Sequence, residues 1–355
     1  MNKNSSIAIV AGIAIAIAVI ASVLAFSGIS NDSTPMESPE QANLVPQAEK
    51  ITILTSFYPY HEFTKNVAGD FADVKQFMPN GVEAHDWEPR AQEIQSLKDA
   101  DVFVYNGLGM ESYIENIIES GEFDNVVFLK ASEGVELLKF EDDHDDHAKH
   151  DDHDDHDEHA KEDDHDEHEE GGHDGHDHDY EFDPHIWLDP ILVKQQVNVI
   201  RDGLIQVDPD NKEHYEENAR IYNDKLDALD MKIGSALSSC QKDTIVPYHN
   251  AFTYLGERYD IHIMALGGMA PDSEASAAEI AEFVDFVKDN DIKVIFSEEL
   301  VDPRLAEVIA EEANAQVLLF SPLEALSKEE AGTNVSYIDK MEDNLDSLKV
   351  ALECQ

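Results

Sequence analysis

Residues 208–237 have the sequence DPDNKEHYEENARIYNDKLDALDMKIGSAL, and this stretch decides the architecture of the chain. Asp208 can cap a helix, and Pro209 suits the first helical position. The apolar residues that follow recur at steps of four and three, which places them on one face of a helix. They are Tyr215, Ala219, Tyr222, Leu226, Leu229, Ile233 and Leu237. A helix from about Pro209 to Ser238 is roughly 45 Å long at ~1.5 Å per residue, so the stretch predicts a long rigid connector between two lobes.

Strand-like and helix-like segments alternate on both sides of this helix. On its N-terminal side we predict strands at 51–56, 73–78, 101–105 and 125–130, with helices at 58–68, 89–98 and 110–120. On its C-terminal side we predict strands at 244–247, 261–266, 293–297 and 316–320, with helices at 251–259, 275–289, 303–314 and 335–352. Such alternation is typical of parallel sheets that helices cover. The sequence therefore predicts an α/β fold of two (β/α)4-type lobes, with any ligand in the cleft between them.

The first residues predict a location outside the cytoplasm. The apolar run from Ile7 to Phe26 has the ~20 residues that a helix needs to span a bilayer, whereas the core of a signal peptide has about 7–15. Lys3 precedes the run, which predicts that everything after Phe26 is extracytoplasmic. We expect an uncleaved membrane anchor. The alternative is a signal peptide that is cleaved near Val23-Leu24-Ala25.

Four parts of the chain follow from these features. Residues 1–50 hold the anchor or signal and a flexible tether, 51–190 the N-terminal lobe, 191–243 the connector and 244–355 the C-terminal lobe. Cys240 and Cys354 are the two cysteines of the chain. In an extracytoplasmic protein they predict one disulfide that closes the C-terminal half, and two separate buried thiols are the alternative.

A histidine–carboxylate tract, residues 141–179, interrupts the N-terminal lobe. It holds 11 of the chain's 17 histidines together with 21 acidic residues and two lysines. The histidines are His144, His147, His150, His153, His156, His159, His165, His168, His173, His176 and His178. Imidazole is a preferred ligand of zinc, and a segment with almost no apolar residue cannot bury a core. We expect a disordered loop that collects metal ions; the alternative is a solvated acidic linker.

The charge balance excludes some partners. The formal net charge is −53. A surface this acidic repels nucleic acid and anionic lipid, so we predict no nucleic-acid partner. It attracts divalent cations, or it reflects life in high salt, and charge alone does not separate these two interpretations.

Three histidines outside the tract are placed where α/β lobes bind ligands, in loops after the carboxyl ends of strands. His85 follows the second predicted strand, His185 precedes the inter-lobe helices, and His249 follows the strand at 244–247. Three neutral imidazoles that converge between lobes suit Zn(II), which accepts nitrogen ligands in tetrahedral geometry. Mn(II) is the alternative metal, although a manganese site is expected to carry more carboxylate.

Several segments together resemble one family, the cluster A-I solute-binding proteins of metal ABC transporters. The segments are Ser56-Phe57-Tyr58-Pro59, residues 81–89, residues 100–111, residues 183–190, Asp208-Pro209 with Tyr215 and Asn218, Tyr248-His249, and Ser273-Glu274-Ala275-Ser276. The resemblance runs from about Ile51 to Leu352. It implies that His85, His185 and His249 are the first three metal ligands. It also implies that the tract, which lies just before the second ligand, marks the zinc-uptake branch.

The fourth ligand departs from the family pattern. Zinc- and manganese-binding members commonly have an acidic residue in an Asp-Pro-Leu type turn after the last strand, whereas this chain has Ser321-Pro322-Leu323. Ser321 is a poor zinc ligand. Water, Glu324 or a tract histidine could fill the position, and we expect water or the tract.

The remaining candidates are expected to be structural. His61, His214 and His262 are interpreted as surface or structural histidines. Glu298 and Glu299 are interpreted as a pair that shapes a loop near the cleft. Trp87 and Trp187 each lie two residues after a proposed ligand, and we expect them to pack the lobe interface.

The function predicted from these features is extracytoplasmic capture of Zn(II) and its delivery to an ABC transporter permease in the membrane. A zinc-dependent hydrolase is the first alternative, because three histidines and a water also form a catalytic site. The sequence has no His-Glu-x-x-His spacing and no paired base or nucleophile motif, so we do not expect an enzyme. An extracellular metal buffer or adhesin without a permease partner is the second alternative.

Overall fold

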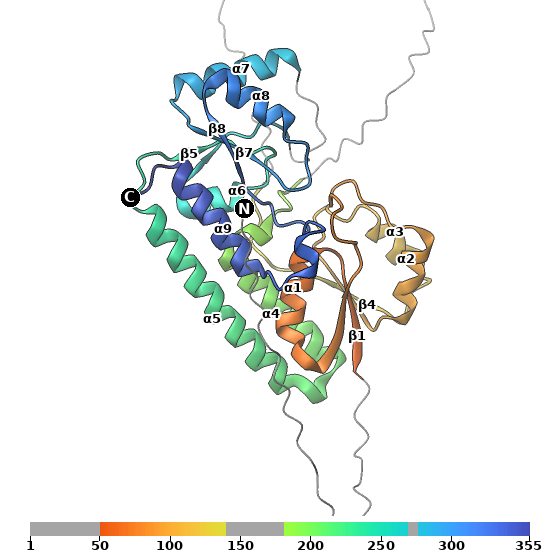
Figure 1. Cartoon of the computed structure of the whole chain (residues 1–355). Helices are drawn as coiled ribbons and strands as arrows, with labels where there is room; N and C mark the ends of the chain where they lie inside the picture. The colour runs from red at the N-terminus through yellow and green to blue at the C-terminus, as the bar shows by residue number, and fades with distance from the viewer. Residues whose placement is uncertain (1–49, 140–180, 269–275) are drawn as a thin grey trace, which may run out of the picture. The chain divides into compact units, whose positions relative to one another are not determined.

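The computed structural model describes residues 50–139, 181–268 and 276–355 (Figure 1). The apolar run Ile7–Phe26 and the tract at 141–179 lie outside these residues. Within the described ranges, no helix is both long and apolar enough to cross a membrane.

The N-terminal lobe is built on a parallel sheet of four strands. The strands are β1 (Ile51–Thr55), β2 (Ala72–Gln76), β3 (Val102–Tyr105) and β4 (Val127–Lys130), in the order β2-β1-β3-β4. The helices of this lobe are α1 (Tyr58–Ala68), α2 (Ala91–Ser96) and α3 (Ile114–Glu119). Val102, Phe103 and Val104 of β3 are fully buried, as expected for a central parallel strand that is covered on both faces.

The C-terminal lobe repeats the alternation with shorter strands. The strands are β5 (Thr244–Ile245), β6 (His262–Ile263), β7 (Val294–Ser297) and β8 (Gln316–Leu319), which pair in parallel as β5-β6 and β7-β8. The Phe296 N–H donates to the Val246 carbonyl at 2.9 Å, which links the two pairs. The helices are α6 (Thr253–Tyr259), α7 (Ala277–Asp289), α8 (Arg304–Ala313) and α9 (Tyr337–Ala351). The predicted α/β fold with two lobes is thus confirmed.

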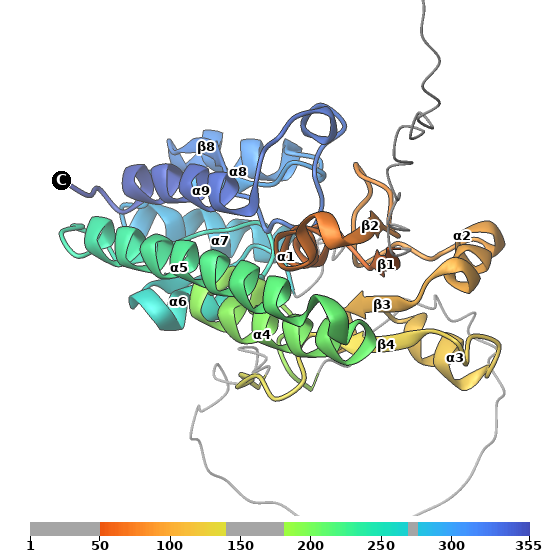
Figure 2. The ribbon, with the colours of Figure 1, turned by 90° about the horizontal axis from the view of Figure 1, so that it is seen from below.

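Two long helices connect the lobes, α4 (Pro190–Val207) and α5 (Lys212–Leu237), and Figure 2 shows them lying against each other. The prediction placed the start of α5 at Pro209, but residues Pro209–Asn211 form a separate 3-10 turn. The Asp208 carboxylate accepts hydrogen bonds from the Asn211 side chain at 2.7 Å and from the Tyr215 hydroxyl at 2.6 Å. These bonds stabilise the turn, so the regular helix begins only at Lys212.

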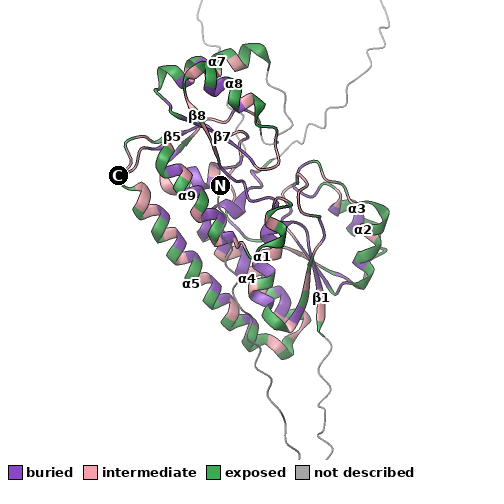
Figure 3. Ribbon diagram, in the orientation of Figure 1, coloured by how far each residue is buried: buried purple, intermediate pink, exposed green. Residues whose placement is uncertain are grey.

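The apolar stripe of α5 packs as the sequence predicts. Six of its seven residues are buried, and Leu237 is partly buried against the same core. Figure 3 shows buried and exposed residues alternating along this helix. The helix contacts α1 of the N-terminal lobe and α9 of the C-terminal lobe. One hydrophobic core therefore joins both lobes through α5.

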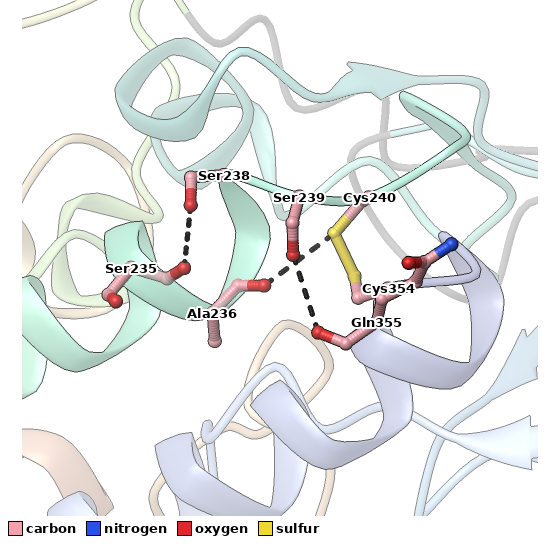
Figure 4. The surroundings of a disulfide bond; sticks show 7 residues. All are labelled: Ser235, Ala236, Ser238, Ser239, Cys240, Cys354 and Gln355. Carbon is pink, nitrogen blue, oxygen red and sulfur yellow. Dashed lines mark hydrogen bonds between the residues drawn. A yellow bond between two sulfur atoms is a disulfide. The ribbon is translucent and has the colours of Figure 1, made fainter.

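A disulfide joins Cys240, just after α5, to Cys354, just after α9 (Figure 4). Next to it, the Ser239 hydroxyl donates to the Gln355 carbonyl at 3.4 Å. The crosslink spans 114 residues and ties the chain end to the helix that holds the lobes together.

Removing the disulfide should destabilise the protein without unfolding it. A crosslink over so long a loop contributes about 2–5 kcal/mol, because it restricts the unfolded chain. We expect Cys240→Ser with Cys354→Ser to lower the free energy of unfolding in urea by about this amount. The reduced wild-type protein should match the double variant. Equal stability of the oxidised and reduced proteins would contradict the expectation.

Candidate metal centre

Four buried side chains from four separate loops meet at one point. His85 follows β2, His185 precedes α4, His249 follows β5, and Glu324 follows β8. His185 and His249 are fully buried, His85 is 6% exposed and Glu324 is 5% exposed. One donor atom from each lies within 4.8 Å of all the others. The structure thus brings together the three histidines that the sequence singled out and Glu324, one of the candidates for the fourth position.

The donor atoms surround a small central space. Glu324 Oε1 lies 3.4 Å from His85 Nε2, 3.5 Å from His185 Nε2 and 3.4 Å from His249 Nε2. His85 Nε2 and His185 Nε2 are 3.3 Å apart. His249 Nε2 and Glu324 Oε1 are buried, and neither atom has a hydrogen-bond partner among the described residues. Buried polar atoms without partners are costly, and three imidazole nitrogens with one carboxylate oxygen fit a tetrahedral Zn(II).

Two carboxylates orient the imidazoles from behind. His185 donates to Asp183 Oδ1 from Nδ1 at 2.8 Å and from its backbone N–H at 2.9 Å. His249 donates to Glu298 Oε1 from Nδ1 at 2.7 Å and from its backbone N–H at 3.2 Å. A proton held on Nδ1 leaves the Nε2 lone pair for a metal, which is the usual role of such partners. The ring of each histidine therefore presents Nε2 to the centre.

Neither of these two carboxylate roles is among the sequence predictions. Asp183 lies two residues before His185, the spacing at which a carboxylate commonly accepts from a nearby backbone N–H, so a local signal existed. Glu298 was interpreted only as a residue that shapes a loop, and it lies 49 residues from its partner His249. No sequence spacing could have paired those two.

The charges around the site shift the pKa values of its members. Burial lowers the pKa of His85. Burial also lowers that of His185, but Asp183 and Glu324 outweigh it and the net pKa is raised. Burial is likewise outweighed at His249, where Glu298 and Glu324 hold the pKa well above its usual value. At Glu324 burial raises the pKa, yet the three surrounding histidines hold it well below the usual range.

A second glutamate lies behind Glu324. Burial and the charge of Glu324 raise the pKa of Glu83 to about 9, so Glu83 carries a proton at neutral pH. Its carboxyl oxygens accept from the backbone N–H groups of His85 and Asp86, both at 3.0 Å. A cavity of about 20 Å³, lined in part by Glu83, Glu298, Glu299 and Glu324, adjoins this pair. That volume is enough for about one water molecule.

Other predicted residues lie elsewhere. The Ser321 backbone N–H donates to the Asn344 side chain at 2.8 Å, and the Ser321 hydroxyl accepts from the Leu323 N–H at 3.2 Å. Glu324, one of the three candidates for the fourth position, is the residue whose carboxylate lies with the three histidines, whereas water or a tract histidine was the favoured prediction. Trp187 is fully buried and donates to the Pro322 carbonyl at 2.7 Å. The tract histidines lie outside the described residues.

The three remaining histidines lie apart from the group. His61 is partly buried on α1, and burial lowers its pKa to about 4. His214 is exposed and stacks on Phe71 with the ring centres 3.8 Å apart. His262 is exposed at the start of β6.

Two parallel-sheet lobes fixed to one helix, with a metal-type donor set buried where their loops meet, define a solute-binding protein for a metal ion. The family described as "Zinc-uptake complex component A periplasmic" matches residues 53–351. The chain belongs to this family, which confirms the resemblance found in the sequence.

Individual relatives support the assignment. The chain is 36% identical to the "High-affinity zinc uptake system protein ZnuA" of Bacillus subtilis over 307 residues, 86% of this chain and 89% of that protein. It is 37% identical to the "Zinc-binding lipoprotein AdcA" of Streptococcus pneumoniae over 304 residues, 84% of this chain and only 55% of that longer protein. The crystal structure of the Zn(II)-bound ZnuA-like domain of the pneumococcal AdcA matches with a TM-score of 0.68 and 34% identity, covering 86% of this chain and all of that domain.

In the metal-free protein the pKa of His249 should be raised. We expect its pKa, followed by NMR, to lie above the ordinary ~6.5 and to fall toward that value in Glu298→Gln. A folded-state pKa above the unfolded one stabilises the fold fully below about pH 6.5. That stability is lost as the pH rises through the folded pKa. An unchanged His249 pKa in Glu298→Gln would contradict the assigned partner.

Proposed function

We propose that this protein captures Zn(II) outside the cytoplasm and delivers it to the permease of an ABC transporter. The observation that carries the proposal is the buried group of His85, His185, His249 and Glu324, in which two donor atoms have no hydrogen-bond partner. Family membership supports it, because the relatives above are named for zinc uptake or zinc binding. Zinc is the cargo here, and the four side chains are its proposed ligands.

The donor set favours Zn(II) over Mn(II). Three imidazoles and one carboxylate suit zinc, whereas manganese prefers more oxygen ligands. Glu324 supplies the fourth metal-ligand atom. Ser321, the residue at the family's usual position for that ligand, is a poor zinc ligand. Two of the ligands come from loops of the N-terminal part of the chain, and two come from the C-terminal lobe, so a bound ion links the lobes.

A hydrolase is the less favoured function. Catalytic zinc sites keep one position open for water. Here Glu324 lies 3.4–3.5 Å from all three ring nitrogens and fills that position from the protein. Nothing in the described structure favours an adhesin or a buffer over transport.

The parts of the chain outside the described residues have proposed roles as well. We propose that Ile7–Phe26 anchors the protein in the membrane, because it has ~20 apolar residues in an unbroken run. The histidines of the tract are proposed to bind additional Zn(II) weakly. The last of them, His178, lies only a short stretch of sequence before His185, which keeps their local concentration at the site high.

The tight site should depend on the four ligands and not on the tract. Deleting residues 142–179 should leave one tightly bound Zn(II) per chain. His249→Ala should weaken that binding by more than about 100-fold, beyond the loss expected for an outer partner. Glu324→Gln should also weaken it. Chelator competition and metal analysis of the purified proteins give both quantities.

His262→Ala is the matched control, because this histidine lies in the same lobe and is exposed. Its affinity should equal that of the wild type. If the deletion abolished tight binding while His249→Ala left it intact, the proposed site would be wrong.

Acid should release the metal with uptake of protons. Ligand imidazoles must be neutral, and carboxylate partners raise the pKa values of His185 and His249 in the metal-free protein. Protons therefore compete with Zn(II) already near neutral pH, and affinity should fall steadily as the pH is lowered from about 8 toward 5, across the free His pKa of ~6.5. Calorimetry in two buffers that differ in ionisation enthalpy counts the protons. Occupancy that persists unchanged to about pH 4, well below that pKa, would argue against imidazole ligands.

A further inference from the structure

The two segments on either side of residues 140–180 pair with each other next to the metal site. Lys139 and Phe182 form an antiparallel bridge, and the Asp183 N–H donates to the Leu138 carbonyl at 3.2 Å. We call these four residues, Leu138, Lys139, Phe182 and Asp183, the tract base. Because Asp183 also orients His185, the tract base and the metal site share one residue.

A tyrosine of the C-terminal lobe binds both sides of the tract base. The Tyr254 hydroxyl accepts from the Leu138 N–H at 3.0 Å and donates to the Asp183 carbonyl at 2.9 Å. Tyr254 is 3% exposed and packs in a buried cluster with Ile186, the residue after His185. The single Tyr254 hydroxyl thus accepts from one backbone group and donates to another, and the two groups lie on opposite sides of the tract base.

The surroundings of the tract base make this contact important. A cavity of about 610 Å³ lies beside it, lined in part by Leu138, Lys139 and Asp183 from the tract base and by Thr253 and Gly256 from α6. Among the described residues, Leu138 packs on the buried cluster that contains Tyr254, and Asp183 is 1% exposed. The two hydrogen bonds of the Tyr254 hydroxyl add directional contacts between the tract base and α6.

Tyr254 is also close to His249 along the chain. Helix α6 begins at Thr253, four residues after His249. The helix that follows one ligand therefore holds a tyrosine that donates to Asp183, the residue that orients another ligand. Tyr254 of α6 bonds to Asp183, and Asp183 bonds to His185. Tyr254 itself has no hydrogen bond to any of the four proposed ligands among its described bonds.

We propose that Tyr254 is a positioning residue for the metal site, which holds the tract base against α6 and, through Asp183, keeps His185 Nε2 aimed at the centre. The inference rests on the proposed zinc-binding function and adds a residue to it. Loss of the hydroxyl leaves the Leu138 N–H and the Asp183 carbonyl without this partner. The loop that carries Asp183 then gains freedom, and zinc dissociates faster.

The test compares Tyr254→Phe with Tyr259→Phe in the full chain. Tyr259 belongs to the same helix and donates one hydrogen bond to Asp230 of α5, away from the tract base. Tyr254→Phe should weaken zinc binding by about tenfold, the lower end of the range for outer partners of a metal ligand, and should speed zinc loss to a chelator by a similar factor. Tyr259→Phe should bind zinc as the wild type does. Hydrogen exchange at the Leu138 amide should accelerate in Tyr254→Phe alone.

A double-mutant cycle shows whether Tyr254 acts through Asp183. Asp183→Asn should weaken binding by itself, and adding Tyr254→Phe to it should weaken binding by much less than tenfold, because both changes affect one contact path. Fully additive effects, or equal zinc affinity in Tyr254→Phe and Tyr259→Phe, would overturn the inference. Since wild-type zinc binding is measured in the same series, a wild type that fails to bind zinc tightly would instead refute the proposed function.

Discussion

Burial of the apolar stripe on α5 is the constraint on which the rest of the structure depends. The stripe is long enough to contact α1 at one end and α9 at the other, so one helix belongs to the cores of both lobes. Neither lobe can move far without exposing part of that stripe to water. The loops at the carboxyl ends of the two sheets are thereby held face to face. Donor atoms from residues as distant in sequence as His85 and Glu324 can then lie within 4.8 Å of each other.

Holding these loops together creates an electrostatic conflict that a metal ion resolves. Three imidazoles crowd one carboxylate, and two further carboxylates favour protonated rings at His185 and His249. Burial raises the pKa of Glu324, but the three surrounding histidines, His85 foremost, hold it well below the usual range. A divalent cation supplies the same positive charge from the centre and displaces the protons. The site therefore exchanges protons for metal, and the carboxylates behind the rings set the pH at which the exchange occurs.

Local patterns were enough to predict the elements but not all of their partners. The stripe of α5 and the β-rich runs follow from periodicity, and His85, His185 and His249 follow from their positions after strands and before the connecting helices. Glu324 was given less weight than water, because its place depends on the path of the chain after Pro322 and not on spacing. The helix start at Lys212 was missed for a similar reason, since Asp208 bonds to Tyr215 across a turn. Both outcomes depend on a contact between a side chain and a distant or irregular segment, and sequence periodicity does not show such contacts.

The loops that carry the four proposed ligands are held by different contacts. His185 and His249 donate from Nδ1 to Asp183 and Glu298. The His85 backbone N–H donates to the Glu83 carboxyl at 3.0 Å, and the Gly81 N–H donates to the Leu326 carbonyl at 2.8 Å, which joins the loop of His85 to the loop of Glu324. Lys340 of α9 pairs with Glu299 and Glu330 and so fixes the far side of the Glu324 loop.

This difference determines how the site can open on a rigid frame. Helix α5 restricts movement of whole lobes, so opening has to come from loops. The bond between Gly81 and Leu326 couples the loops of His85 and Glu324, one from each lobe. Asp183 and Glu298, by contrast, each belong to the same lobe as the histidine that they orient. The four-ligand set therefore depends on a contact between the lobes, whereas the orientation of His185 and His249 is set within each lobe.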